Sequence, residues 1–331
     1  MATTISPDKI LKELAELWVD SGKQGQAEGG SGVLRACSMT LLVLGEAQED
    51  TQDLGETIAA LMPEHPARTI LVRLSGAGDR SLTERVYSQC WMPFGQRRQI
   101  CCEQVEITVS DAALADLRSV VLPLTVADLP LIVWCRSTRL LAMKEFREIV
   151  QMADKIVLNS ADAADAAGLL ERANAALGRG AMLGDLSWTM LTRWREMLAQ
   201  VFENHENAGK LARVTDIEVH WGGSRYIPAL YLGAWVRDSL AGAGVSAKLR
   251  ISRESDQDQL LVRLSGEGIE VTLTREDDRM IVTLNGASQC TNLPQPSDYH
   301  LMREELGIVR HDPVFEKTLA SAAQLAHPIQ R

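Results

Sequence analysis

Cysteine and histidine are the residues of this chain best suited to nucleophilic, redox or metal chemistry, yet their spacing defines no site. The six cysteines and six histidines include no C-x-x-C pair and no cluster at metal-ligand spacing. Cys37, Cys101 and Cys135 lie in apolar or strand-like runs, where cysteine usually acts as a small buried hydrophobe. We therefore predict no metal site and no catalytic cysteine.

Phosphate-binding loops are the next chemistry to consider. A dinucleotide site would need Gly-x-Gly-x-x-Gly after the first strand, but the chain reads LGEAQED over Leu44–Asp50, whose carboxylates would repel a pyrophosphate. The glycines of Ser75–Asp79 could form an anion nest, although a plain turn is the simpler interpretation. Walker A, His-Glu-x-x-His and Gly-x-Ser-x-Gly sequences are also absent from the chain. We assign no catalytic residue, nucleotide site or cofactor.

Four short segments stand out instead: His65–Thr69 (HPART), Cys101–Glu106 (CCEQVE), Asp185–Trp188 (DLSW) and Tyr231–Trp235 (YLGAW). In the first, Pro66 ends the preceding helix and the next strand begins beside it. In the third, an aspartate directly before a helical pattern is expected to cap that helix.

The second segment alternates in a way that places charge inside the protein. If 99–109 is a strand, adjacent Cys101 and Cys102 point to opposite faces, and at least one carboxylate points toward a face covered by helices. That carboxylate needs a partner, and the available arginines are Arg68, Arg73, Arg97 and Arg98. We expect a structural ion pair rather than acid–base catalysis.

Tryptophans concentrate at the start of the second half of the chain, where they either build a core or anchor a protein interface. Core is the default for tryptophan at helical spacing. If one of them is exposed, Trp194 is the candidate, because Arg193 and Arg195 flank it. The candidate partner-binding residues are Trp188, Trp194, Arg193, Arg195 and Trp235.

The pattern of elements predicts an α/β protein with two domains, preceded by an N-terminal helix (5–19) and a glycine-rich linker within residues 1–32. Residues 33–180 alternate strands with helices and predict a doubly wound, Rossmann-like domain with a mostly parallel sheet. The expected strands are 34–44, 69–74, 99–109, 131–135 and 155–158, and the expected helices are 54–62, 82–90, 112–122, 140–152 and 163–177.

Residues 181–331 predict an α+β domain. A long helix over 187–203, a strand over 212–220 and a helix over 226–240 precede strands at 247–252, 259–264, 269–274 and 280–284. Short polar turns separate the later strands, which favours an antiparallel meander.

Composition bounds the function. With 46% hydrophobic and 24% charged residues, the chain can bury a sizeable core, and its net charge of −10 disfavours nonspecific nucleic-acid binding. Charged residues interrupt the N-terminal apolar positions, and the longest apolar runs are strand-sized. We therefore expect a cytoplasmic protein with no membrane segment; self-association is left open.

As a collinear set, the four segments resemble the glucose-6-phosphate dehydrogenase assembly protein family, OpcA. The resemblance runs from Leu34–Cys37 through Pro130–Trp134 to Tyr231–Trp235. The chain departs from relatives at Cys135, where they have a second tryptophan, at Ser187, where they often have asparagine, and at Arg193, where many have proline.

The resemblance implies a non-catalytic regulatory subunit that binds glucose-6-phosphate dehydrogenase and activates it, supporting the oxidative pentose phosphate pathway and NADPH supply. Redox control of some relatives also makes Cys101 and Cys102 candidate redox residues, with Cys90 or Cys290 as the pairing thiol.

Two other classes remain open. One is an enzyme that binds a nucleotide or sugar phosphate at the carboxyl ends of the first domain's strands. The other is a metabolite or thiol sensor, with Arg68, Arg136 and Arg139 as candidate anion contacts.

Overall fold

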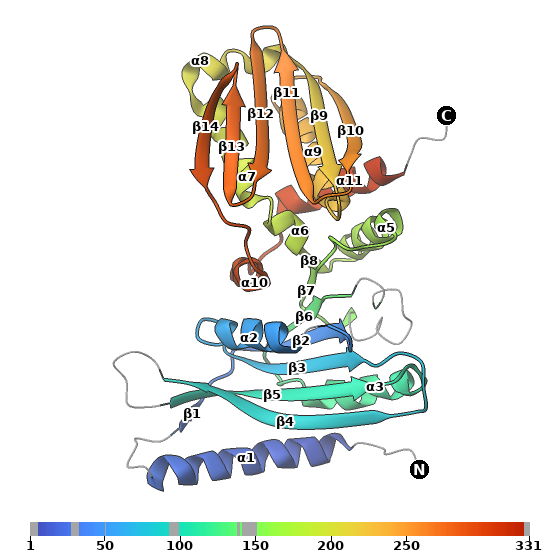
Figure 1. Ribbon diagram of the computed structural model, residues 1–331. Helices are drawn as coiled ribbons and strands as arrows, with labels where there is room; N and C mark the ends of the chain where they lie inside the picture. The colour runs from blue at the N-terminus through green and yellow to red at the C-terminus, as the bar shows by residue number, and fades with distance from the viewer. Residues whose placement is uncertain are drawn as a thin grey trace. The chain divides into compact units, whose positions relative to one another are not determined.

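The computed structural model describes residues 6–27, 33–49, 51–92, 99–137, 140 and 151–327. These residues form two compact units, each built on its own sheet (Figure 1). The first comprises the described residues up to Asn159 together with Ala181–Leu183, and the second comprises Ser160–Gly180 and the described residues from Gly184 onward. Within the described residues, no helix combines the length and apolarity needed to cross a membrane.

The first unit contains an eight-stranded sheet. Its strands are β1 (Val33–Arg35), β2 (Met39–Glu46), β3 (Ala67–Leu74), β4 (Leu82–Trp91), β5 (Gln99–Val109), β6 (Leu131–Cys135), β7 (Lys155–Leu158) and β8 (Met182–Asp185), which runs across the division between the units. Its helices are α1 (Pro7–Ala27), α2 (Thr51–Leu61) and α3 (Leu114–Val121), with short 3-10 turns at Asp111–Ala113 and Leu122–Leu124. Every residue of β3 and all but the last of β2 are buried, as expected for strands covered on both faces.

Strand order identifies the architecture of this sheet. Its main path is β5-β3-β2-β6-β7-β8, with β1 beside the start of β5 and β4 on the other side of β5. Numbered along the chain without β1 and β4, these strands lie in the order 3-2-1-4-5-6, which is the Rossmann order. The pairs β2–β3, β3–β5, β2–β6 and β6–β7 are parallel. The predicted Rossmann-like α/β domain is confirmed.

One predicted helix of this unit is wrong. Residues 82–90 belong to β4, which pairs antiparallel with β5 along its whole length. The segment contains Thr83, Val86, Tyr87 and Trp91, which favour strands, and it can pair with an exposed edge of β5. Helix α1 packs on β4 (Figure 1).

The N-terminal helix is longer than predicted. It begins at Pro7 as expected but continues to Ala27, through residues assigned to the linker. Lys23, Gln24, Gln26 and Ala27 are good helix formers, and they outweigh the two glycines among them. Residues 28–32 of the predicted linker lie outside the described residues, as does most of the predicted helix 140–152.

The second unit is built on a six-stranded sheet. Its strands are β9 (Val214–Gly222), β10 (Lys248–Ser255), β11 (Gln259–Gly266), β12 (Ile269–Glu276), β13 (Arg279–Leu284) and β14 (Ala287–Asn292), in the order β10-β9-β11-β12-β13-β14. The helices are α5 (Ala166–Leu177), α6 (Leu186–Thr189), α7 (Thr192–Glu203), α8 (His205–Ala208), α9 (Tyr226–Gly242), α10 (Asp298–Gly307) and α11 (Pro313–Ala326), with a 3-10 turn at Leu211–Arg213. Helix α9 packs on β9 and β10, α11 packs on α9, and α5 packs on α11 (Figure 1).

Burial alternates along the central strands of this sheet. On β11, Leu260, Val262 and Leu264 are buried while the residues between them are partly exposed, so the sheet covers its core on one face only. From β9 through β11 to β14, successive neighbours pair antiparallel, which confirms the predicted antiparallel character.

The first strand of the predicted meander lies elsewhere. Strand β10 pairs parallel with β9, because helix α9 carries the chain from one to the other as a crossover connection. The predicted long helix 187–203 is also divided, between α6 and α7. At this division, the carbonyl oxygen of Trp188 accepts from the Leu191 amide at 3.0 Å, in a 3-10-like turn, and from Arg195 Nη1 at 2.8 Å.

Strands β8 and β14 and helices α8, α10 and α11 were not predicted.

Candidate functional site

In an open doubly wound sheet, ligands bind beyond the carboxyl ends of the strands where strand order reverses, here between β2 and β6. The chain's own charges occupy this position. Arg136 Nε donates to Glu49 Oε2 at 2.6 Å, and the Ser137 hydroxyl donates to Glu46 Oε1 at 2.9 Å. The Glu46 amide donates to Glu49 Oε1 at 3.1 Å, closing the turn after β2.

This arrangement opposes a dinucleotide at the usual Rossmann position. A Cβ at Gly45 would lie 3.0 Å from Glu49 Oε2, so the carboxylate packs directly against the backbone that a pyrophosphate would approach. Nearby, burial raises the pKa of Cys135 to about 12, with Glu49 and Glu46 adding to the increase, so this thiol stays protonated.

Glu103 is the buried carboxylate that the alternation of the second segment predicts. Its Oε2 accepts from Arg68 Nε at 2.6 Å, and its Oε1 accepts from Trp18 Nε1 at 2.6 Å and pairs with Arg35 Nη2 at 2.8 Å. Arg68 Nη1 also donates to the Leu124 carbonyl oxygen at 2.9 Å. Four separate elements thus meet on one carboxylate, and the predicted structural ion pair is confirmed.

A second pair follows the same rule. Arg73 Nε donates to Glu106 Oε1 at 2.8 Å across the β3–β5 pairing. The other two arginines offered for this role, Arg97 and Arg98, lie outside the described residues.

The two candidate anion contacts that lie in the described residues are each held by a carboxylate. Arg68 is buried against Glu103, and Arg136 is paired with Glu49. Arg139 lies outside the described residues.

Asp185 joins the third and fourth segments. Its Oδ1 accepts from the Ser187 amide at 2.9 Å, which confirms the predicted helix cap, and from the Ser160 hydroxyl at 2.8 Å. Its Oδ2 accepts from the Tyr231 hydroxyl at 2.8 Å. Burial raises the pKa of Asp185 to about 6, although all three donors lower it.

The same cluster holds the C-terminal helices. Thr189 Oγ1 donates to Glu305 Oε1 at 2.5 Å, which ties α6 to α10. Trp188 packs against Tyr231 and against Phe315 of α11, with ring centroids 6.2 and 5.7 Å apart. The two segments therefore build the core of the second unit.

Sequence reasoning did not link Ser160, Glu305 or Phe315 to this cluster, because their contacts are with residues remote in the sequence. The only local signal was the position of Ser160 just after a strand.

Neither candidate tryptophan of the α6–α7 region is exposed: Trp188 is 3% and Trp194 is 4% accessible. Arg195 stacks over the Trp188 ring at 3.5 Å, and burial lowers its pKa to about 10. Arg193 is exposed and pairs with Glu196.

Trp235 is more accessible to solvent than Trp188 and Trp194. It is half-buried and lines an apolar groove of about 290 Å³ between α7 and α9, together with Phe202. Leu198, Val236, Leu240 and Leu264 are the buried members of the same lining.

The cysteines separate into distinct groups. Cys90 and Cys101 form a disulfide between directly opposed positions of β4 and β5. Cys102 is buried, and burial raises its pKa to about 11. Cys290, the other offered pairing partner, is an exposed free thiol. Within the described residues, no group of three potential ligands could hold a metal ion.

Comparison with solved structures yields reductases and oxidoreductases. A 3-ketoreductase from Actinomadura kijaniata is 10% identical with a TM-score of 0.49, covering 87% of this chain and 95% of that chain. An oxidoreductase from Sinorhizobium meliloti is 12% identical with a TM-score of 0.48, covering 88% and 96%. Strand order, rather than these scores, carries the fold assignment.

Curated relatives are cyanobacterial proteins named OpcA, whose names tie them to the OxPP cycle. The Synechococcus elongatus protein is 24% identical over 235 residues, which are 70% of this chain and 50% of that protein. The Synechocystis sp. protein is 24% identical over 196 residues, which are 58% and 40%. The chain thus spans half or less of the length of these relatives.

Two family models match in succession and together cover most of the chain. Residues 58–175 match the glucose-6-phosphate dehydrogenase subunit N-terminal domain, and residues 181–319 match the C-terminal domain of the same subunit. The four segments that drew attention in the sequence lie within these matches. The chain therefore belongs to the OpcA family of glucose-6-phosphate dehydrogenase assembly proteins.

Proposed function

We propose that this protein is a non-catalytic regulatory subunit that binds glucose-6-phosphate dehydrogenase and activates it allosterically. It would thereby support the oxidative pentose phosphate pathway and NADPH production. The observation that carries the proposal is the pair of matched family models, both described as domains of a glucose-6-phosphate dehydrogenase subunit. The names of the cyanobacterial relatives support the same pathway.

Activation of this kind needs no catalytic residue in the activator. A subunit that binds the active conformation of an enzyme better than the inactive one shifts the population toward activity, by no more than its difference in binding free energy. Glu46 and Glu49 support a role without a bound dinucleotide, because they place negative charge where a pyrophosphate would sit.

We place the dehydrogenase contact at the apolar groove around Trp235. Aromatic anchors seated in well-packed pockets dominate the energetics of protein interfaces. Glu203 is the charged member of the lining, so the groove fits an apolar side chain of the dehydrogenase flanked by a basic one. Arg193 lies on the same helix as Phe202 and is exposed for a further contact.

The test measures the initial velocity of the cognate dehydrogenase, at substrate well below half-saturation, while the purified protein is titrated in. A saturable rise in rate is expected, with no rate from the protein alone. No change in velocity together with no co-elution of the two proteins would overturn the proposal.

Matched variants locate the contact. Trp235→Ala should weaken the apparent affinity by about thirtyfold, which corresponds to a loss of roughly 2 kcal/mol at an interface anchor. Trp221→Ala is the control, because Trp221 is also half-buried in the second unit but stacks on Tyr226 outside the groove. Equal affinities for the two variants would exclude the groove as the docking site.

A thiol-based control of the activator is a second candidate function, favoured by the Cys90–Cys101 disulfide. If this bond regulates activation, dithiothreitol should change the titration curve of the wild-type protein. It should leave the curve of Cys90→Ser unchanged.

A further inference from the structure

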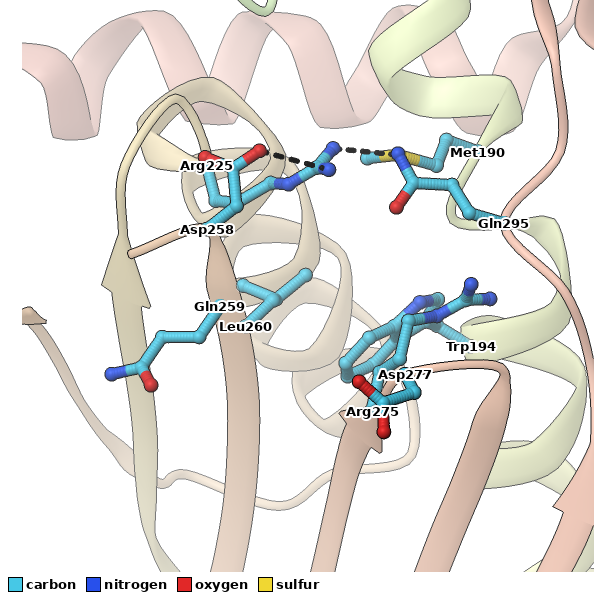
Figure 2. Close-up of a pocket in the computed structure, with 9 residues that line it drawn as sticks. All are labelled: Met190, Trp194, Arg225, Asp258, Gln259, Leu260, Arg275, Asp277 and Gln295. Carbon is cyan, nitrogen blue, oxygen red and sulfur yellow. Dashed lines mark hydrogen bonds and ion pairs between the residues drawn. The ribbon is translucent and has the colours of Figure 1, made fainter. Parts of the chain in front are cut away.

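Four connections of the second sheet converge at one of its ends. Strands β9, β10, β12 and β14 finish at this end, as the pairs Ser255↔Gly222 and Arg279↔Asn292 require. The convergence encloses a pocket of about 210 Å³ within the second unit (Figure 2). The lining comes from the α6–α7 turn, α7, the residue before α9, the ends of β11 and β12 and these connections, and it includes Trp194, Arg225, Asp258, Gln259, Arg275 and Gln295.

Two arginines of this lining have donors without a good acceptor. Figure 2 shows the Arg225 guanidinium between Asp258 and Met190. Its Nη2 pairs with Asp258 Oδ2 at 3.2 Å, but its Nη1 faces the Met190 thioether sulfur at 3.1 Å, a weak acceptor. Arg275 Nη1 is buried and has no hydrogen-bond partner in the part of the chain that the structure describes.

The two carboxylates of the lining, Asp258 and Asp277, leave Arg225 Nη1 and Arg275 Nη1 without a carboxylate acceptor. Asp258 is already held by the Ser224 amide, which donates to Oδ1 at 2.7 Å, and by Arg225. Asp277 is exposed in the turn between β12 and β13. Burial lowers the pKa of Arg275 and the nearby charge of Arg225 lowers it further, while Asp278 acts in the opposite direction. An anion between the two arginines would favour the charged form of Arg275.

We propose that this pocket binds a small organic anion through a phosphate or carboxylate group placed between Arg225 and Arg275. Guanidinium groups hold such oxygens through charge-assisted hydrogen bonds. The amides of Gln259 and Gln295 offer donors and acceptors to hydroxyl groups, and the Trp194 ring offers apolar surface to a carbon skeleton.

The volume limits the ligand. About 210 Å³ equals roughly seven water molecules at ~30 Å³ each, and it lies below the ~300–1,000 Å³ typical of drug-sized sites. A small phosphorylated or carboxylated metabolite fits this range, whereas a dinucleotide is too large.

The test is isothermal titration calorimetry of the whole 331-residue chain with glycerol 3-phosphate and inorganic phosphate, at constant ionic strength. Glycerol is the uncharged control. Saturable binding of glycerol 3-phosphate and none of glycerol are expected. Absence of saturable binding for both anions at millimolar concentration would overturn the proposal.

The variants Arg275→Gln and Arg279→Gln remove the same charge from the same β-hairpin, but Arg279 is exposed and outside the lining. Arg275→Gln should weaken binding about tenfold or more, and Arg279→Gln should leave it unchanged. Equal affinities of the two variants for the anion would contradict the proposed site.

A measurement on the wild-type protein covers the case in which Arg275→Gln does not fold. Glycerol 3-phosphate should slow modification of Arg275 by phenylglyoxal, relative to Arg279, as read by mass spectrometry. Equal rates with and without the anion would contradict the proposal. Because the dehydrogenase is not used, failure here leaves the proposed function untouched.

Discussion

Replacing Tyr231 by phenylalanine tests the buried cluster that joins the third and fourth segments. Tyr231 and Asp185 are both fully buried, and the tyrosine hydroxyl donates to Asp185 Oδ2 at 2.8 Å. The substitution removes this one donor and keeps the ring that packs against Trp188 and Phe315.

The expected cost follows from the charge on the acceptor. Hydrogen bonds to charged groups contribute about 1.5–3 kcal/mol, and the carboxylate would keep only the donors from Ser160 and Ser187. We expect the free energy of unfolding to fall by about 2 kcal/mol at pH 8.

The pH dependence gives the prediction a sign. The pKa of Asp185 is raised from 3.8 to about 6, so protonation favours the folded state. The resulting stabilisation is complete below the unfolded-state pKa and is lost as pH rises through the folded-state pKa. Removing the Tyr231 donor raises the folded-state pKa further, so the difference between wild type and variant should be larger at pH 8 than at pH 5.

The assay is urea unfolding at pH 8 and pH 5, followed by tryptophan fluorescence and far-UV circular dichroism. The control is Tyr226→Phe on the same helix, since the Tyr226 hydroxyl has no hydrogen bond within the described residues. A loss below about 0.5 kcal/mol at pH 8, or a larger loss at pH 5, would refute the reasoning.

Two other substitutions test the first unit. Glu103→Gln leaves Arg68 buried without its carboxylate and should lower the free energy of unfolding by about 3 kcal/mol or more. The control is Glu196→Gln in the exposed pair with Arg193, which should lower it by less than about 1 kcal/mol. Urea unfolding of both variants measures the two values. Cys90→Ser opens the disulfide that closes a loop with a sequence separation of 11 and should lower stability by up to about 3 kcal/mol under oxidising conditions. Under dithiothreitol, wild type and Cys90→Ser should unfold at similar urea concentrations, and a persistent difference would argue against loop closure as the cause.

Local patterns were enough to predict much of the fold. Continuous apolar runs identified the buried strands of the first sheet, and alternation within Cys101–Glu106 identified a carboxylate that needs an arginine. The aspartate before α6 was recognisable as a cap because capping depends on residues two or three positions away.

Contacts between remote segments set the limit of that reasoning. The local sequence does not predict that Trp18 and Arg35 contact Glu103. Nor does it predict that Tyr231 contacts Asp185. Arg225 and Arg275 are 50 positions apart and meet at one pocket only because the second sheet returns its turns to the same end. Strand β4 was predicted as a helix because its strand conformation depends on pairing with the remote edge of β5, which the local sequence does not show.

Because the segments of the two units alternate along the chain, the choice of fragment ends matters when the second unit is produced alone. The family models divide the chain between residues 175 and 181, but helix α5 packs on α11 within the second unit. A fragment that starts at 181 would uncover the side of α11 that packs on α5, including Ala323, and should aggregate. A fragment that starts at 160 would retain α5, and we expect this longer fragment to remain monodisperse on its own.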